Sequence, residues 1–116
     1  MELVHEDNSD GVRIIRLKGR MDIEGNNSIA LRFNALALGG GPMVVVDLSG
    51  LEFLSSIGIA TLVQSAKAAR LRKGILALFG ARPHVLTSLE RTNIPSIIPT
   101  CSTLDEALAR VSASEA

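Results

Sequence analysis

Two adjacent serines, Ser55 and Ser56, are the residues of this chain whose type and position best suit a chemical role. They follow an apolar run at 43–48 and precede a segment, from Ile57, with the apolar spacing of a helix. A serine at a helix start lies beside backbone N–H groups that lack a partner within the helix, and such amides can accommodate a phosphate. The pair therefore predicts a helix cap, which is the more common use of serine there, or a phosphorylation site.

The elements that position these serines can be read from apolar spacing. Alternating or continuous apolar runs predict strands near 3–6, 12–18, 43–48, 75–79 and 97–98. Apolar residues three or four apart predict helices over 24–38, 57–73, 83–92 and 104–111, with Gly74 ending the second. The order β-β-α-β-α-β-α-β-α predicts an α/β fold with a mixed central β-sheet, an opening hairpin and parallel crossovers. The run at 43–48 should lie in the middle of that sheet.

Composition limits the function. The 116 residues suit one domain, 1–116, with a frayed tail at 113–116. Lysine plus arginine equals aspartate plus glutamate at 12 each, so nothing favours nucleic acid as a partner. A single cysteine and the lack of an apolar run of about 18 residues predict a reducing cytoplasm and no membrane insertion.

The segment around the serines resembles a known family signature. Asp47-Leu48-Ser49-Gly50, followed by Phe53-Leu54-Ser55-Ser56-x-Gly58-Ile59, resembles the phosphorylation site of STAS domains, the anti-sigma-factor antagonist family. Leu17-x-Gly19-x-Met21-Asp22 resembles its second landmark, and Ile97-Ile98 with Ser102-x-x-Asp105-Glu106-Ala107-Leu108 its closing segment. The resemblance implies the STAS fold over nearly the whole chain. One departure is Ser55, because many phosphorylated members carry Asp immediately before the acceptor serine.

The resemblance implies a bacterial phosphoprotein that regulates transcription by partner switching. Its unphosphorylated form would bind a serine-kinase anti-sigma factor and free a sigma factor, and phosphorylation at Ser56 would release it. Ser55 is the second choice of acceptor. The partner-binding residues implied are Asp22, Ser55, Ser56, Gly58 and Ile59. No cofactor is expected, since ATP would belong to the kinase.

A second class of function stays open. STAS domains also serve as constitutive, non-enzymatic subunits of lipid-transporting ABC assemblies and of sensory scaffolds. In that role the helix after Ser56 would pack permanently on a partner, without a phosphate. Self-association into a weak homodimer is left open. No nucleophile, base and oxyanion site occur together, so we do not expect an enzyme.

Other candidate sites are weaker. Asp47 with Glu6-Asp7 could form an acidic, Mg²⁺-binding pocket like that of response-regulator receivers. However, no lysine ends a late strand, and Asp47 is expected to hydrogen-bond the following loop instead.

The solitary His5 and His84 do not suggest a metal site, and Cys101 lacks an activating partner. Gly39-Gly40-Gly41 is expected to be a connector. A cluster of cations indicates a solvated helix end that could also dock an acidic partner: Lys67, Arg70, Arg72 and Lys73.

Overall fold

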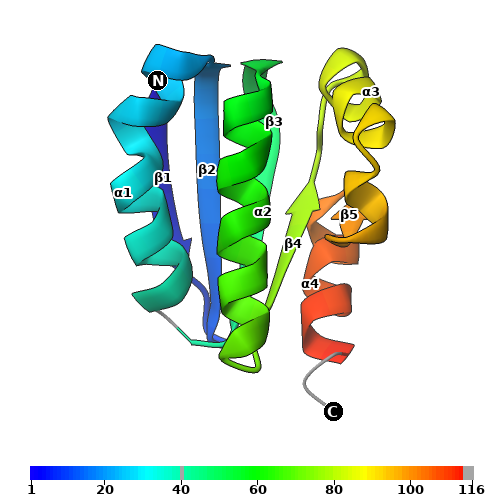
Figure 1. The fold of residues 1–116 in the computed structure, drawn as a ribbon. Helices are drawn as coiled ribbons and strands as arrows, with labels where there is room; N and C mark the ends of the chain where they lie inside the picture. Colours follow the sequence, from blue (N-terminus) through cyan, green and yellow to red (C-terminus); the bar gives the residue numbers. More distant parts are fainter. Residues whose placement is uncertain (40, 114–116) are drawn as a thin grey trace.

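The structure, a computed structural model, describes residues 1–39 and 41–113. Its elements are β1 (Glu2–Asp7), β2 (Val12–Met21), α1 (Ile23–Gly39), β3 (Met43–Leu54), α2 (Ser56–Leu71), β4 (Ile75–Phe79), α3 (Pro83–Arg91), a 3-10 turn η1 (Ile94–Ser96), β5 (Thr100–Cys101) and α4 (Leu104–Ala113). The predicted order of strands and helices is confirmed (Figure 1). Of the tail predicted to fray, Ala113 ends α4 and residues 114–116 lie outside the described part.

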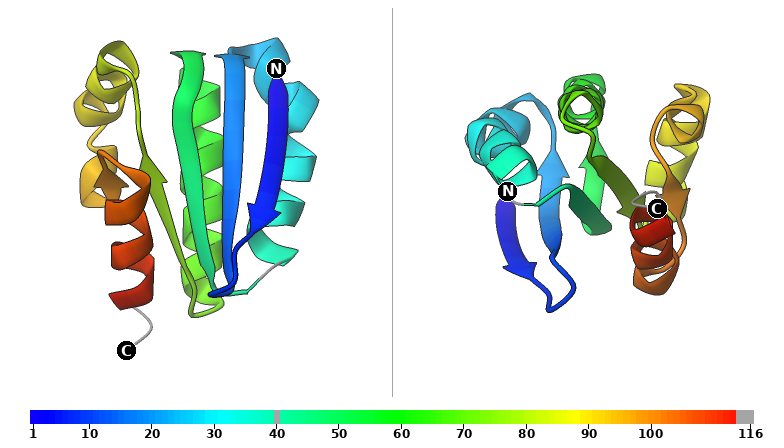
Figure 2. Two further views of the ribbon diagram at one scale, coloured as in Figure 1. Left: turned by 180° about the vertical axis from the view of Figure 1, so that it is seen from behind. Right: turned by 90° about the horizontal axis from the view of Figure 1, so that it is seen from below.

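The strands form one mixed sheet in the order β1-β2-β3-β4-β5, with β3 in the middle as predicted. Only the β1–β2 hairpin is antiparallel, and β2 through β5 run parallel. Helices α1 and α2 cover one face and α4 the other (Figure 2). The core is therefore divided into two layers. Phe33 and Leu62 pack on the first face of the sheet, and Ala107 and Val111 on the second.

Strand β3 is longer than predicted, because it continues from residue 48 to Leu54. The turn-forming residues after Asp47 do not break it, since β2 also extends and pairs beside it as far as Met21. Gly50 allows this close pairing, because a Cβ there would lie 2.8 Å from the carbonyl oxygen of Leu17. The loop expected between strand and helix is reduced to Ser55 alone.

The end of α2 also differs in detail from the prediction. The helix ends at Leu71, and the residue with left-handed backbone is Lys73, at φ 62°, instead of Gly74. The N–H of Gly74 donates to the carbonyl of Ala69 at 2.7 Å, and that of Lys73 to the carbonyl of Arg70 at 2.9 Å. This pair of bonds is a Schellman motif. Gly74 is required for a different reason, since a Cβ would lie 2.6 Å from the Pro42 carbonyl oxygen.

The last strand was predicted at Ile97-Ile98, and this is wrong. The N–H groups of both isoleucines donate to the carbonyl of Ile94 at 2.8 Å, which continues the 3-10 turn and buries Ile98. Strand β5 follows at Thr100–Cys101 and pairs only with Leu78 and Phe79. The first half of β4 therefore has no neighbouring strand on that side within the described chain.

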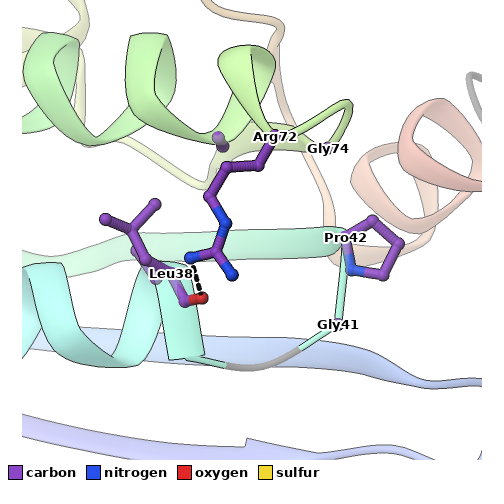
Figure 3. A pocket seen from close by; sticks show the side chains of 7 residues that line it. Leu38, Gly41, Pro42, Arg72 and Gly74 are labelled. Carbon is purple, nitrogen blue, oxygen red and sulfur yellow. Dashed lines mark hydrogen bonds between the residues drawn. The ribbon is translucent and has the colours of Figure 1, made fainter.

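The C-terminal end of α1 is satisfied by arginines from elsewhere in the chain. All of α1 is described, and its last turn contains no basic residue. Arg72, the C-cap of α2, donates to the Leu38 carbonyl at 2.6 Å, and Arg13 of β2 donates to the Leu36 carbonyl at 3.0 Å. Figure 3 shows Arg72 reaching across a hollow of about 210 Å³ between the two helix ends. Of the glycine connector predicted there, Gly40 lies outside the described residues.

Candidate functional site

The serine pair lies where the two longest strands end. Met21, the last residue of β2, is the register partner of Leu54, the last residue of β3. A helix follows each strand almost at once, so the starts of α1 and α2 lie side by side at one end of the sheet (Figure 1). Two helix N-termini, each with unpaired N–H groups, therefore share one edge of the molecule.

Ser55 caps α2 and is held by three hydrogen bonds. Its backbone is extended, at φ −85° and ψ 169°, and its hydroxyl oxygen accepts from the N–H of Gly58 at 3.2 Å. The same hydroxyl donates to the carbonyl of Met21 at 2.7 Å, and the Ser55 N–H donates to that carbonyl at 3.0 Å. The capping interpretation is confirmed for Ser55. Its hydroxyl is half-buried and fully engaged.

Ser56, the first residue of α2, is exposed. Its hydroxyl makes no hydrogen bond to any described residue, in contrast to its neighbour. The first bond of the helix runs from the N–H of Ile59 to the carbonyl of Ser55 at 3.0 Å. The N–H groups of Ser56 and Ile57 precede that bond and have no partner in the described chain. The free hydroxyl thus lies beside free amides, and the first turn of α2 contains no acidic side chain.

Asp22 has the matching position at the start of α1. Its Oδ1 accepts from the N–H of Gly25 at 2.8 Å, so it caps that helix. Its other oxygen lies 3.9 Å from Nε of Arg20. Gly25 permits this tight turn, because a Cβ there would lie 2.0 Å from the carbonyl oxygen of Arg20. Since Ser55 is bonded to Met21, the neighbour of Asp22, the two capped turns form one unit.

Two of the predicted contact residues face inward. Gly58 is buried, and a Cβ there would lie 2.9 Å from Cδ1 of Leu54 and from Cγ of Met21. Ile59 is half-buried and packs against the core. Gly58 thus brings α2 close to the strand ends, and Ile59 anchors the helix. Their contact with a partner stays a prediction.

Three exposed apolar residues at this edge were not predicted as site residues from the sequence. Ile23 follows the Asp22 cap and is 66% exposed, Ile57 follows Ser56 and is 38% exposed, and Phe53 near the end of β3 is also 38% exposed. The guanidinium carbon of Arg20 lies 4.7 Å from the centroid of the Phe53 ring. The sequence contained a signal for Ile23 and Ile57, because each follows directly on a serine or aspartate that can cap a helix. A side chain in the first turn of a helix lies at the edge of the core and not over its centre. We call Ile23, Phe53 and Ile57 the apolar rim.

The acidic-pocket alternative is not supported by the geometry. Oδ2 of Asp47 lies 3.5 Å from Nε of Arg16, and its Oδ1 accepts from the N–H of Ser49 at 2.9 Å, which confirms its predicted bond to the following residues. Arg16 also binds Glu6 at 2.6 Å. Among the described residues, no group of three or more His, Cys, Asp or Glu side chains could hold a metal ion.

The structure also shows the surroundings of His84 and Cys101. His84 Nε2 lies 2.7 Å from the carbonyl oxygen of Glu52 and so donates to it. Burial raises the pKa of the Cys101 thiol, which keeps it in its unreactive protonated form. None of the helices in the described ranges is long and apolar enough to span a membrane.

The geometry agrees with comparisons against known proteins. The model of the STAS domain family matches residues 6–107. The chain belongs to the STAS domain family. A relative, the putative anti-sigma factor antagonist BtrV of Bordetella bronchiseptica, is 30% identical over 103 residues, 89% of each chain. This STAS domain also superimposes on the crystal structure of an anti-sigma factor antagonist from Mycobacterium paratuberculosis, with a TM-score of 0.85, 27% identity and coverage of 96% and 93%.

A more distant neighbour shares the STAS fold. The anti-sigma factor antagonist SpoIIAA, in its unphosphorylated form, superimposes with a TM-score of 0.77 at 18% identity, covering 97% of each chain. SpoIIAA from Bacillus is also known in a phosphorylated form, which superimposes with a TM-score of 0.70. At this identity the comparison establishes the common fold alone.

Proposed function

We propose that this STAS domain is a cytoplasmic anti-sigma-factor antagonist that acts by partner switching, with Ser56 as the phosphorylated residue. Its unphosphorylated form binds a serine-kinase anti-sigma factor and so frees a sigma factor, and phosphorylation releases it. The observation that carries the proposal is the difference between the two serines. Ser56 offers an exposed, unbonded hydroxyl beside free amides, whereas the hydroxyl of Ser55 is engaged. The names of the related proteins support the same role.

The choice of Ser56 over Ser55 has a physical basis. A phosphate on Ser55 would remove the hydrogen that it donates to Met21 and place negative charge against that carbonyl oxygen. It would also disturb a cap, which contributes about 1 kcal/mol. An ionised Asp at position 55, as in many family members, could accept from Gly58 but could not donate to Met21. Ser55 therefore supplies the cap without adding charge next to Ser56.

The surface offered to the partner combines the Ser56 hydroxyl with the apolar rim. Exposed apolar side chains next to a polar group are typical of the centre of a protein interface, where their burial supplies binding energy. Ile23 comes from α1, Phe53 from β3 and Ile57 from α2. Because Ile57 is the next residue after Ser56, a partner that buries Ile57 also lies close to Ser56. Asp22 lies within the same edge and contributes a polar border.

The energies of phosphorylation are large enough to release the partner and too small to unfold the domain. A phosphoserine adds a charge of about −1.5 to −2. At a helix N-terminus this charge is favourable by only about 0.3–1 kcal/mol, so the fold survives the modification. A like charge of the partner about 4 Å away costs on the order of 4 kcal/mol at an effective dielectric constant of 20. That cost is roughly a thousandfold in affinity.

The proposal is tested by incubating the protein with candidate serine kinases of its organism and ATP, followed by intact-mass measurement. We expect a gain of one phosphate that Ser56→Ala abolishes and Ser49→Ala, an exposed serine on β3, leaves in place. Phosphate that persists in Ser56→Ala would refute the assignment of Ser56.

The alternative, a constitutive STAS subunit of a transporter or sensory assembly, is favoured by one observation. Leu71, on the last turn of α2, is 87% exposed, so part of this helix could pack permanently on a partner. Stable association of the unmodified protein with a transporter ATPase, equal for wild type and Ser56→Asp, would favour this function over the switch.

A further inference from the structure

A groove of about 390 Å³ opens at the edge of β4, at the opposite end of α2 from Ser56. It exists because β5 pairs only with Leu78 and Phe79, which leaves the first half of β4 without a strand on that side. Most of its exposed wall is polar, and Ile97 and Pro99 supply an apolar part. A volume of this size lies within the range of small-molecule sites.

Two arginines from opposite faces of the sheet line this groove. Arg70 comes from the last turn of α2, and Arg110 from the last turn of α4. No aspartate or glutamate is among the described residues that line it. The described wall of the groove thus contains two cations and no carboxylate.

Arg70 differs from most arginines of the chain in having no bonding partner among the described residues. The following arginines donate to a carbonyl or a carboxylate: Arg13, Arg16, Arg32, Arg72 and Arg82. The donors of Arg70 are thus available to a ligand. A guanidinium group matches phosphate and carboxylate oxygens with two parallel hydrogen bonds.

The end of α2 does not repel an anion as strongly as a bare helix C-terminus would. The carbonyl of Ala69 accepts from the N–H groups of Arg72 and Gly74, at 3.1 and 2.7 Å, and the carbonyl of Arg70 accepts from that of Lys73 at 2.9 Å. Lys73 also adds positive charge at this helix end. The negative pole of the helix is therefore largely satisfied next to the groove.

We propose that this groove binds a small organic anion. Its phosphate or carboxylate group lies at Arg70, in the wall that Arg110 also lines, and its apolar part packs against Ile97 and Pro99. This site is separate from the partner-switching surface, because α2 runs between them. It gives the protein a ligand site that does not depend on the state of Ser56.

Isothermal titration calorimetry of the full chain at low ionic strength tests the site, with phenyl phosphate, benzoate and inorganic phosphate as probes. We expect saturable binding of phenyl phosphate or benzoate, and the tighter of the two identifies the acidic group. Inorganic phosphate should bind more weakly, since it lacks an apolar part. Added salt should weaken binding, because the contact is electrostatic.

Arg70→Gln should weaken binding by about 10-fold or more, the effect of losing a hydrogen bond between charged groups. Arg91→Gln is the matched control, because Arg91 is also exposed, lies in the last turn of α3 and has no bond to a described residue. It should leave the affinity unchanged. Thermal denaturation identifies any variant that fails to fold, and Arg70→Gln, an exposed change, is the decisive one.

Amide chemical shifts locate the ligand independently. Changes on titration should be largest at Gly74, Leu76 and Ile97. The proposal is overturned if neither organic probe binds saturably, if Arg91→Gln weakens binding as much as Arg70→Gln, or if the shifts concentrate around Ser56.

Discussion

The hydroxyl of Ser55 donates a hydrogen bond of 2.7 Å to the carbonyl of Met21, a residue 34 positions earlier in the chain. This bond joins the end of β2 to the start of α2 and leaves Ser56 as the serine with a free hydroxyl. The two neighbouring serines therefore have different environments, one bonded within the fold and one exposed.

The first prediction concerns stability. Ser55→Ala removes a cap and a hydrogen bond to Met21, so it should lower the free energy of unfolding by about 1–3 kcal/mol. Ser56→Ala should change it by less than about 0.5 kcal/mol, as for an exposed position without contacts. Urea denaturation of both variants measures the difference. Equal losses in the two variants would contradict the division of roles.

The second prediction concerns the apolar rim. Ile57→Glu places a charge in the partner surface, and it should weaken binding of the unphosphorylated protein to its anti-sigma factor by about 10-fold or more, as at an interface hot spot. Leu31→Glu is the control, since Leu31 is 88% exposed on α1. Surface plasmon resonance compares the two. If Leu31→Glu lost affinity and Ile57→Glu did not, the interface would lie on the outer side of α1 and the prediction would be wrong.

The third prediction concerns the turn around Asp22. Gly25→Ala would bring a Cβ to 2.0 Å from the Arg20 carbonyl oxygen, so the backbone must shift and stability should fall by about 2 kcal/mol or more. Among the described residues, a Cβ at position 39 would meet only Nη1 of Arg13, at 3.9 Å, so Gly39→Ala should be tolerated. Thermal denaturation checks both. A tolerated Gly25→Ala would show that the turn is looser than the contact indicates.

The fourth prediction concerns the bond drawn in Figure 3. Arg72→Ala removes the donor to the Leu38 carbonyl and should cost about 1 kcal/mol, with faster hydrogen exchange at the end of α1. Arg91→Ala removes a similarly exposed arginine and should cost almost nothing. Hydrogen exchange that is unchanged in Arg72→Ala would show that water replaces the guanidinium without loss.

The fifth prediction concerns pH. Hydrogen bonds of 2.7 and 3.0 Å from Arg13 lower the pKa of the Asp7 carboxyl below its unfolded value. A lowered folded pKa means that the pair stabilises the protein above the unfolded pKa, and that this contribution is lost as the pH falls through the folded pKa. Asp7→Asn should therefore reduce the fall in stability between pH 5 and about 2. An NMR titration of Asp7 at its unfolded value would contradict this.

The order of strands and helices depends on local patterns, so it could be predicted from the sequence. Apolar spacing, the glycine-rich connector and the Ser55-Ser56 step each depend on residues a few positions apart, so they predicted the helices, the central position of β3 and the start of α2. The cap of α4 is likewise local, since Thr103 Oγ1 accepts from the N–H of Glu106 at 3.2 Å.

Features that depend on partners distant in sequence required the tertiary structure. Strand β3 reaches Leu54 because β2 pairs with it. Strand β5 lies at Thr100–Cys101 because Ile97 and Ile98 continue the preceding 3-10 turn. The C-terminal carbonyls of α1 are bonded by Arg13 and Arg72. The same holds for the site. The sequence by itself determined that a serine would cap α2, but the carbonyl of Met21 decided that Ser55 is engaged and Ser56 free, because that contact exists only when the two strand ends meet.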